Sequence, residues 1–197
     1  MYYYILVVIL ILYIIYDVNY VLRTLFTILS GRMLEKSYSL HDPTTIYGIC
    51  TYLDCDESFR SLRLARLLRE IDIARFHFYD RTGIYERSQI LKISSLQGCT
   101  LSTTCEPVGL FQIYKITTKL VYWDDRSLFL EHEVATLSDG KLRHVIVSRQ
   151  HPIGKDRNST EALLHELKGA ENSPSCPEYI SHWIRSNEIS SLKFKKI

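Results

Sequence analysis

The first 16 residues of the chain, MYYYILVVILILYIIY, carry no charged side chain, and the first charge is that of Asp17. As a helix this run would be about 24 Å long, and continuing it through Leu22 brings it near the ~20 residues that cross a bilayer. It has no Lys or Arg before Arg23 and no Ala, so it lacks the basic start and small-residue cleavage site of a secretory signal. We therefore predict an uncleaved transmembrane anchor over residues 1–22.

The orientation of this anchor follows from the basic residues beside it. Arg23, Arg32 and Lys36 all lie on its C-terminal side, and the positive-inside rule then places the rest of the chain in the cytosol. Membrane lipid is thus one expected partner. The alternative is a secreted domain with its leader removed, which would be glycosylated at Asn158 in the triplet Asn-Ser-Thr. In the cytosol that triplet would not be glycosylated.

Composition excludes several classes of protein. Hydrophobic residues make up 46% and charged residues 23% of the 197 residues, as in a globular chain with one domain and an appendage. Lys and Arg number 24 against 22 Asp and Glu, a net charge of +2, so nucleic acid is not an expected partner. The five cysteines are odd in number and show no C-x-x-C spacing, which argues against a disulfide framework and against a metal site.

The elements after the anchor begin with a helix and linker over residues 23–44, with the helix lying at the membrane surface. Residues 45–53 are short, β-branched and aromatic and predict a strand. Residues 57–79 have apolar side chains at the i, i+3, i+4, i+7 spacing of an amphipathic helix, and Gly83 ends it.

Beyond a variable stretch at 84–98 the pattern changes to strands joined by turn sequences. We expect an antiparallel meander over residues 99–106, 110–123, 127–137 and 141–150. Helices are expected at 159–168 and 178–192. These elements predict an α+β protein with a long helix against a sheet, divided into a main domain at 45–155 and a helical extension at 156–197.

Several segments carry a family resemblance. They are ARLLREIDIARF at 65–76, RTGIYE at 81–86, YWDDRSLFLEHEVATLSDG at 122–140 and HWIRSNEISS at 182–191. Together they resemble the family called thioesterase superfamily member 6 over roughly residues 45–192, and the apolar leader is similar too. The resemblance implies a hotdog fold, in which a curved antiparallel sheet wraps a long central helix. It also implies a relation to acyl-CoA thioesterases and a homodimer or higher oligomer, and we expect the endoplasmic reticulum membrane as its location.

The same resemblance points to catalytic residues. In active hotdog relatives a carboxylate near the helix start acts as nucleophile or general base, and helix amides polarise the thioester carbonyl. Asp54 and Asp56 keep the D-x-D spacing expected there, although helix capping would also place acidic residues at this point. Residues 61–64 replace the polar H-x-N-N of the pattern, and residues 103–108 replace a basic stretch.

Two arginines are candidates for binding coenzyme A. Arg66 and Arg69 belong to a series that recurs every third residue from Arg60, and guanidinium groups suit the phosphates of the nucleotide. Exposed basic residues that face solvent or anionic lipid are the alternative. No cofactor is expected other than coenzyme A as part of a substrate.

Two functions remain open at this point. One is a membrane-anchored hydrolase of acyl-CoA thioesters in which Asp54 or Asp56 activates water. The other is a catalytically degenerate hotdog protein that binds acyl groups or serves as a scaffold, which the loss of H-x-N-N favours.

Overall fold

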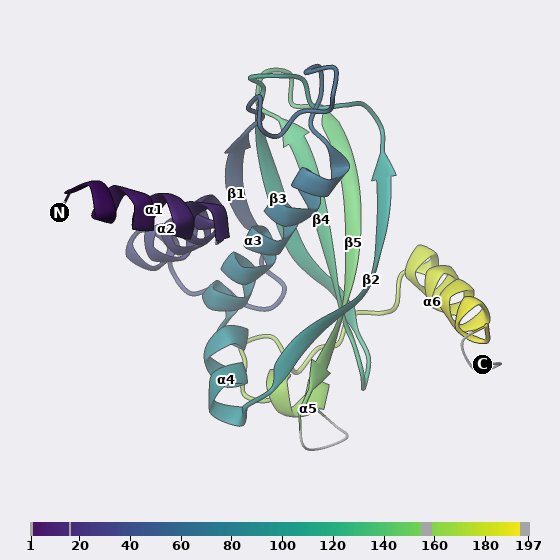
Figure 1. Cartoon of the computed structure of the whole chain (residues 1–197). Coiled ribbons are helices and arrows are strands. Elements are labelled where there is room, and N and C mark those ends of the chain that lie inside the picture. The colour runs from purple at the N-terminus through teal and green to yellow at the C-terminus, as the bar shows by residue number, and fades with distance from the viewer. Residues whose placement is uncertain (1, 16, 155–158, 194–197) are drawn as a thin grey trace.

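A five-stranded antiparallel sheet curves around one long helix (Figure 1). The computed structural model describes residues 2–15, 17–154 and 159–193, so the expected glycosylation position Asn158 lies outside the described residues. The strand order is β1-β3-β4-β5-β2. The strands are β1 (Thr44–Ile49), β2 (Ser94–Thr104), β3 (Ile113–Trp123), β4 (Leu128–Thr136) and β5 (Leu142–Ile153), and the helix is α3 (Leu64–Thr82). This arrangement confirms the α+β hotdog fold.

Helix α3 begins seven residues later than its predicted start at residue 57. The intervening loop pairs its backbone with a second loop instead, since Leu62 N donates to Val108 O at 2.9 Å and Leu110 N donates to Arg60 O at 3.2 Å. These tertiary bonds outweigh the local helical tendency. The predicted end is confirmed, because Gly83 takes the left-handed conformation (φ 83°) that terminates helices.

The meander is smaller than predicted. Only β3, β4 and β5 are consecutive neighbours, whereas β2 crosses over to pair with β5 at the edge of the sheet. The stretch at 84–98 contains helix α4 (Ile84–Leu91) and the first residues of β2. The predicted strand at 45–53 ends at Ile49 because the chain leaves the sheet there for the loop before α3.

The core lies between α3 and the concave face of the sheet. Leu67, Ile71, Ala74 and Phe78 of α3 are almost fully buried. Within the sheet, His132 is fully buried, with its ring nitrogens 2.9 Å from Thr118 Oγ1 and 3.1 Å from Ser148 Oγ. Burial lowers the pKa of His132 to about 3, so the ring is neutral at physiological pH.

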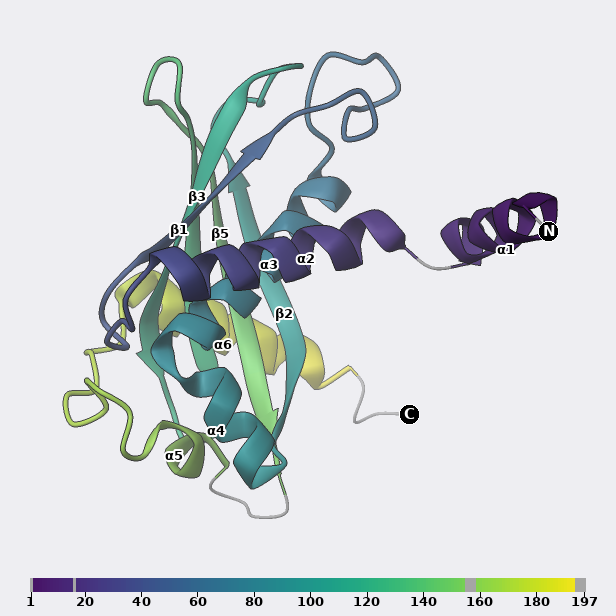
Figure 2. The same ribbon diagram turned by 90° about the vertical axis from the view of Figure 1, so that its left-hand side faces the viewer.

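The two N-terminal helices differ in how they are placed relative to the domain. Helix α2 (Val18–Leu34) crosses α3 beside β1, while α1 (Tyr2–Ile15) projects away from the domain (Figure 2). In the described part of the chain no single helix is both long and apolar enough to cross a membrane; α1 and α2 pass that test as a pair, with a 79° bend between them.

The two C-terminal helices pack in different places. Helix α5 (Ser159–Leu164) contributes Leu163 and Leu164 to the core beneath α3. Helix α6 (Glu178–Ser191) lies on the convex face, where Ile180 and Trp183 contact Phe129. Helices were expected at both places, and α5 is shorter than predicted.

Candidate functional site

Helix α2 is held against α3 by polar contacts along its whole length. The pairs are Asp17 with Arg69, Arg23 with Glu70 at 2.6 Å, and Arg32 with Asp80 at 2.5 Å. At Gly31 the two helices touch, since a Cβ there would lie 2.8 Å from the Nε2 atom of His77. Helix α2 therefore forms a wall of the domain, and any site beside the start of α3 includes it.

Asp54 lies in the loop that precedes α3 and is 9% exposed. Its carboxylate accepts hydrogen bonds from Thr51 N at 3.0 Å, Thr51 Oγ1 at 2.6 Å and Arg66 Nη2 at 2.8 Å. Burial alone would raise the pKa of Asp54, but the bonds from Thr51 and the Arg66 guanidinium hold it below its usual value. Asp54 is therefore ionised at neutral pH.

Asp56, the second predicted carboxylate, faces its own loop. It accepts hydrogen bonds from Arg60 N at 3.1 Å, Ser58 Oγ at 2.9 Å and Ser61 Oγ at 3.1 Å, and these bonds lower its pKa. Neither aspartate caps α3, because Arg63 occupies the N-cap position and no side chain bonds to the cap. The capping interpretation is thus wrong, and the structure does not bring Asp54 and Asp56 together.

A pocket of about 180 Å³ opens between α2, the start of α3 and the end of β1. Asp54 and Glu70 line it together with Arg23, Arg66 and Arg69. We call this the polar pocket. Asp17 lines it as well, so three carboxylates and three guanidinium groups converge on one small space.

Glu70 is the residue that sequence reasoning missed. It is 8% exposed, and burial raises its pKa, which the positive charge of Arg23 opposes and the negative charge of Asp54 reinforces. Although Arg23 Nη2 lies 2.6 Å away, Glu70 Oε2 has no partner in hydrogen-bond geometry within the described residues. The sequence could have indicated the burial of Glu70 through its position in the helix. A glutamate three residues after Leu67 and four before Ala74 lies on the apolar face of α3.

The structure places both predicted coenzyme A ligands at the polar pocket, and each already has a carboxylate partner. Arg66 pairs with Asp54, and Arg69 pairs with Asp17 while its guanidinium lies 5.0 Å from the centre of the Tyr20 ring. Arg63 turns away and donates to Leu53 O at 3.1 Å. Incoming phosphates would therefore have to share or displace these partners.

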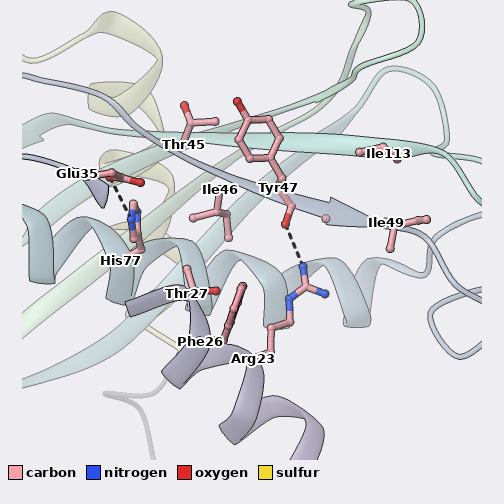
Figure 3. A pocket seen from close by; sticks show the side chains of 11 residues that line it. Arg23, Phe26, Thr27, Glu35, Thr45, Ile46, Tyr47, Ile49, His77 and Ile113 are labelled. Carbon is pink, nitrogen blue, oxygen red and sulfur yellow. Dashed lines mark hydrogen bonds and ion pairs between the residues drawn. The ribbon is translucent and has the colours of Figure 1, made fainter. Parts of the chain in front are cut away.

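A second, larger cavity of about 570 Å³ adjoins the polar pocket between α2 and β1 (Figure 3). We call it the apolar cavity, since Phe26, Ile46 and Ile113 are among the side chains that line it. Arg23 and Ile49 line both spaces. A molecule with a polar head and an apolar tail would find both environments side by side.

The curved sheet around one central helix defines a protein of the hotdog fold class. The sequence model of the Thioesterase-like superfamily matches residues 50–184. Protein THEM6 of Drosophila melanogaster is 42% identical over 191 residues, which cover 97% of each chain. Protein THEM6 of Xenopus laevis is 32% identical over 91% of this chain and 85% of that protein. This chain belongs to the thioesterase-like superfamily and, within it, to the THEM6 family.

Solved structures agree in fold. YbaW Probable Thioesterase from Escherichia coli aligns with a TM-score of 0.53 at 16% identity, over 60% of this chain and 86% of that one. The 4-hydroxybenzoyl CoA thioesterase from Pseudomonas sp. strain CBS-3 aligns with a TM-score of 0.52 at 14% identity, over 61% and 98%.

Proposed function

We propose that this protein is a membrane-anchored hydrolase of acyl-CoA thioesters whose reaction takes place in the polar pocket. One observation carries the proposal: Asp54 and Glu70 line the same pocket, and their pKa values are displaced in opposite directions. When the pKa values of two carboxylates in one site are displaced in opposite directions, the group with the lower pKa can stabilise charge and the group with the higher pKa can accept a proton.

The environments of the two carboxylates assign their roles. Glu70 has the raised pKa and an oxygen without a hydrogen-bond donor, so it takes the proton from the attacking water. The water oxygen bonds to the thioester carbon, the C–S bond breaks, and Glu70 returns the proton to the leaving thiolate. Asp54 stays ionised and positions Arg66, which together with the amides of the first turn of α3 stabilises the oxyanion.

Asp56 has a different part in this proposal. Its bonds to Ser58, Arg60 and Ser61 fix the loop that precedes α3. It therefore acts through the position of Asp54 rather than on the substrate. Arg69 remains the second candidate, with Arg66, for the phosphates of coenzyme A.

The test is the release of free coenzyme A by the full chain in detergent or vesicles, from acyl-CoAs of increasing length. We expect turnover with the unchanged protein and its loss in Glu70→Gln, whereas Glu57→Gln, an exposed residue outside the pocket, retains it. Absence of turnover above buffer for every acyl-CoA, with folded protein, contradicts the hydrolase proposal.

The second candidate function is an acyl-binding or scaffolding protein without catalysis. It is favoured by the pairing of both carboxylates with arginines, Asp54 with Arg66 and Glu70 with Arg23. Ion pairs of this kind also serve stability alone. Acyl-CoA binding by calorimetry together with no coenzyme A release would support this function.

Anchoring to the membrane is supported by the exposed apolar surface of the N-terminal helices. From Tyr2 to Tyr13, α1 exposes large apolar and tyrosine side chains. The outer face of α2 exposes a stripe of four such residues at helical spacing: Leu22, Leu25, Leu29 and Met33. We place the domain on the cytosolic face of the endoplasmic reticulum membrane. Glycosylation of Asn158 or loss of the leader would instead identify a secreted protein.

A homodimer is the oligomer we propose. Strand β2 is the outermost strand beside β5, and most of its residues from Ser94 to Thr104 are exposed. An edge strand offers unpaired backbone groups to a second copy. Native mass spectrometry of the full chain would test this, and a monomer at micromolar concentration would contradict it.

A further inference from the structure

The apolar cavity runs along α2 and is separate in chemistry from the polar pocket. Helix α2 and β1 form its two sides, with Phe26 and Thr27 on one and Ile46 on the other, while His77 of α3 lies beside Glu35 at one end (Figure 3). Its volume of about 570 Å³ falls within the range of small-molecule sites. From Arg23 to Glu35, both of which line it, α2 advances by about 18 Å, so the space is elongated.

Arg23 stands where the two spaces meet. Its Nη2 atom lies 2.6 Å from Glu70 Oε2 in the polar pocket and 3.3 Å from Tyr47 O on β1. Ile49 lines both spaces as well. A cation is therefore placed at the end of an otherwise apolar space, beside the carboxylate assigned to catalysis.

The opposite end of the cavity is also polar, and its histidine is buried. The side chain of His77 is 2% exposed, and its Nε2 atom lies 3.3 Å from Glu35 Oε2. Its Nδ1 atom has no hydrogen-bond partner among the residues that the structure describes. An unpaired buried nitrogen in a cavity wall is costly, and a ligand or a water that follows the ligand would satisfy it.

We propose that the apolar cavity binds the linear acyl chain of the substrate, with its thioester or carboxylate head at Arg23. The charge of Arg23 matches a carbonyl or carboxylate oxygen, and the elongated apolar space between a helix and a strand fits a chain better than a ring system. This inference deepens the proposed function and rests on it for the thioester, whereas binding of a free fatty acid does not require hydrolysis.

The rim of the cavity also indicates how the chain enters. Phe26 is 73% exposed and lies on the same side of α2 as the apolar stripe proposed to face the membrane. Across the cavity Tyr47 of β1 is 64% exposed. The chain therefore enters from the lipid side, and its head group reaches the polar pocket last.

The experiment uses the full chain in phosphatidylcholine vesicles and palmitic acid with a photoreactive diazirine near its methyl end. Labelled peptides are mapped by mass spectrometry, and we expect label on β1 around Thr45, at the end of the cavity away from Arg23, as well as on α1. Thr27→Trp fills the cavity and should lower the label on β1 by about tenfold, leaving the label on α1 unchanged. Ile49→Trp, at the junction of the two spaces, is a second blocking variant with the same expected result.

Leu29→Trp is the matched control, because it adds the same bulk to the outer face of α2 and should not alter the label on β1. Label confined to α1, or label on β1 that neither blocking variant reduces, overturns the inference. Label on β1 that the blocking variants remove, without any coenzyme A release, supports the cavity and ends the hydrolase proposal. Turnover whose preference for acyl length is the same in Thr27→Trp keeps the hydrolase and rejects the cavity.

Discussion

Arg66 Nη2 lies 2.8 Å from Asp54 Oδ1, so the residue predicted to catalyse and a residue predicted to bind coenzyme A are partners of each other. The side chain of Asp54 is 13% exposed and that of Arg66 is 30% exposed. In this partly buried setting the pair links the loop before α3 to the first turn of the helix. Its removal should therefore affect both stability and the handling of substrate.

Asp54→Asn should destabilise the fold by about 2 kcal/mol, because it leaves Arg66 without its charged partner in a partly buried place. The amide oxygen can still accept the bonds from Thr51, which limits the loss. Chemical denaturation gives the free energy of unfolding, and the KM for acyl-CoA should rise as Arg66 loses its orientation. Asp56→Asn is the comparison, since it loosens the loop that positions Asp54 but leaves Arg66 paired, and its effect on KM should be the smaller one. Equal effects of the two variants on KM would contradict the assignment.

Glu70→Gln should lower kcat by about a hundredfold, the usual contribution of a general base. In the unchanged enzyme the carboxylate form is the active one, so activity should fall as the pH decreases through the raised pKa of Glu70. The pH profile of kcat/KM checks this, because the acid limb should disappear from the residual activity of Glu70→Gln. An unchanged acid limb in the variant would assign the proton acceptor elsewhere.

Gly31→Ala should loosen the contact between α2 and α3, since the added Cβ would lie 2.8 Å from His77 Nε2. The contact also includes the Arg81 guanidinium, which donates to Gly31 O at 3.0 Å. We expect faster proteolysis between α2 and β1 and a lower melting temperature. Ser30→Ala is the neighbouring control, and a variant Gly31→Ala as resistant as the control would show that the helices are not in close contact.

His132 should make the protein less stable in acid. Its pKa is about 3 in the folded protein and near 6.5 when unfolded, so below pH 6.5 the unfolded chain binds a proton that the folded chain does not. The stability contributed by the neutral ring is present above pH 6.5 and falls by about 1.4 kcal/mol per pH unit down to pH 3. Denaturation curves at several pH values, compared with His132→Gln, should show a shallower slope for the variant. Parallel slopes would contradict a neutral buried ring.

The predictable part of the fold was set by local patterns. The apolar spacing from Leu64 to Phe78 and the glycine at position 83 predicted most of α3 and its end. Turn sequences between segments rich in Val, Ile, Leu, Tyr and Thr predicted β3, β4 and β5. The start of α3 was missed because the backbone bonds of this loop to Val108 and Leu110 join segments that are distant in sequence. The edge position of β2 was missed for the same reason, since register against β5 is a tertiary property.

The site was predictable only where a motif marked it. Asp54 was identified from the D-x-D spacing that the family resemblance implies, whereas no motif pointed to Glu70, whose burial depends on α2. The pairing of Arg23 with Glu70 joins residues 47 positions apart, and no local pattern indicates it. The sequence also predicted an anchor at 1–22 and a juxtamembrane helix and linker at 23–44, whereas the structure packs α2 against α3.

The docking of α2 has a practical meaning for anyone who prepares this protein. A soluble fragment that starts after residue 36 would still contain the whole sheet and α3, and it could pass every check of folding. It would nevertheless expose Glu70, Asp80 and His77 to water, and it would lack the side of the apolar cavity that α2 forms. Inactivity of such a fragment would result from the removal of α2 and would not show that the full chain is inactive.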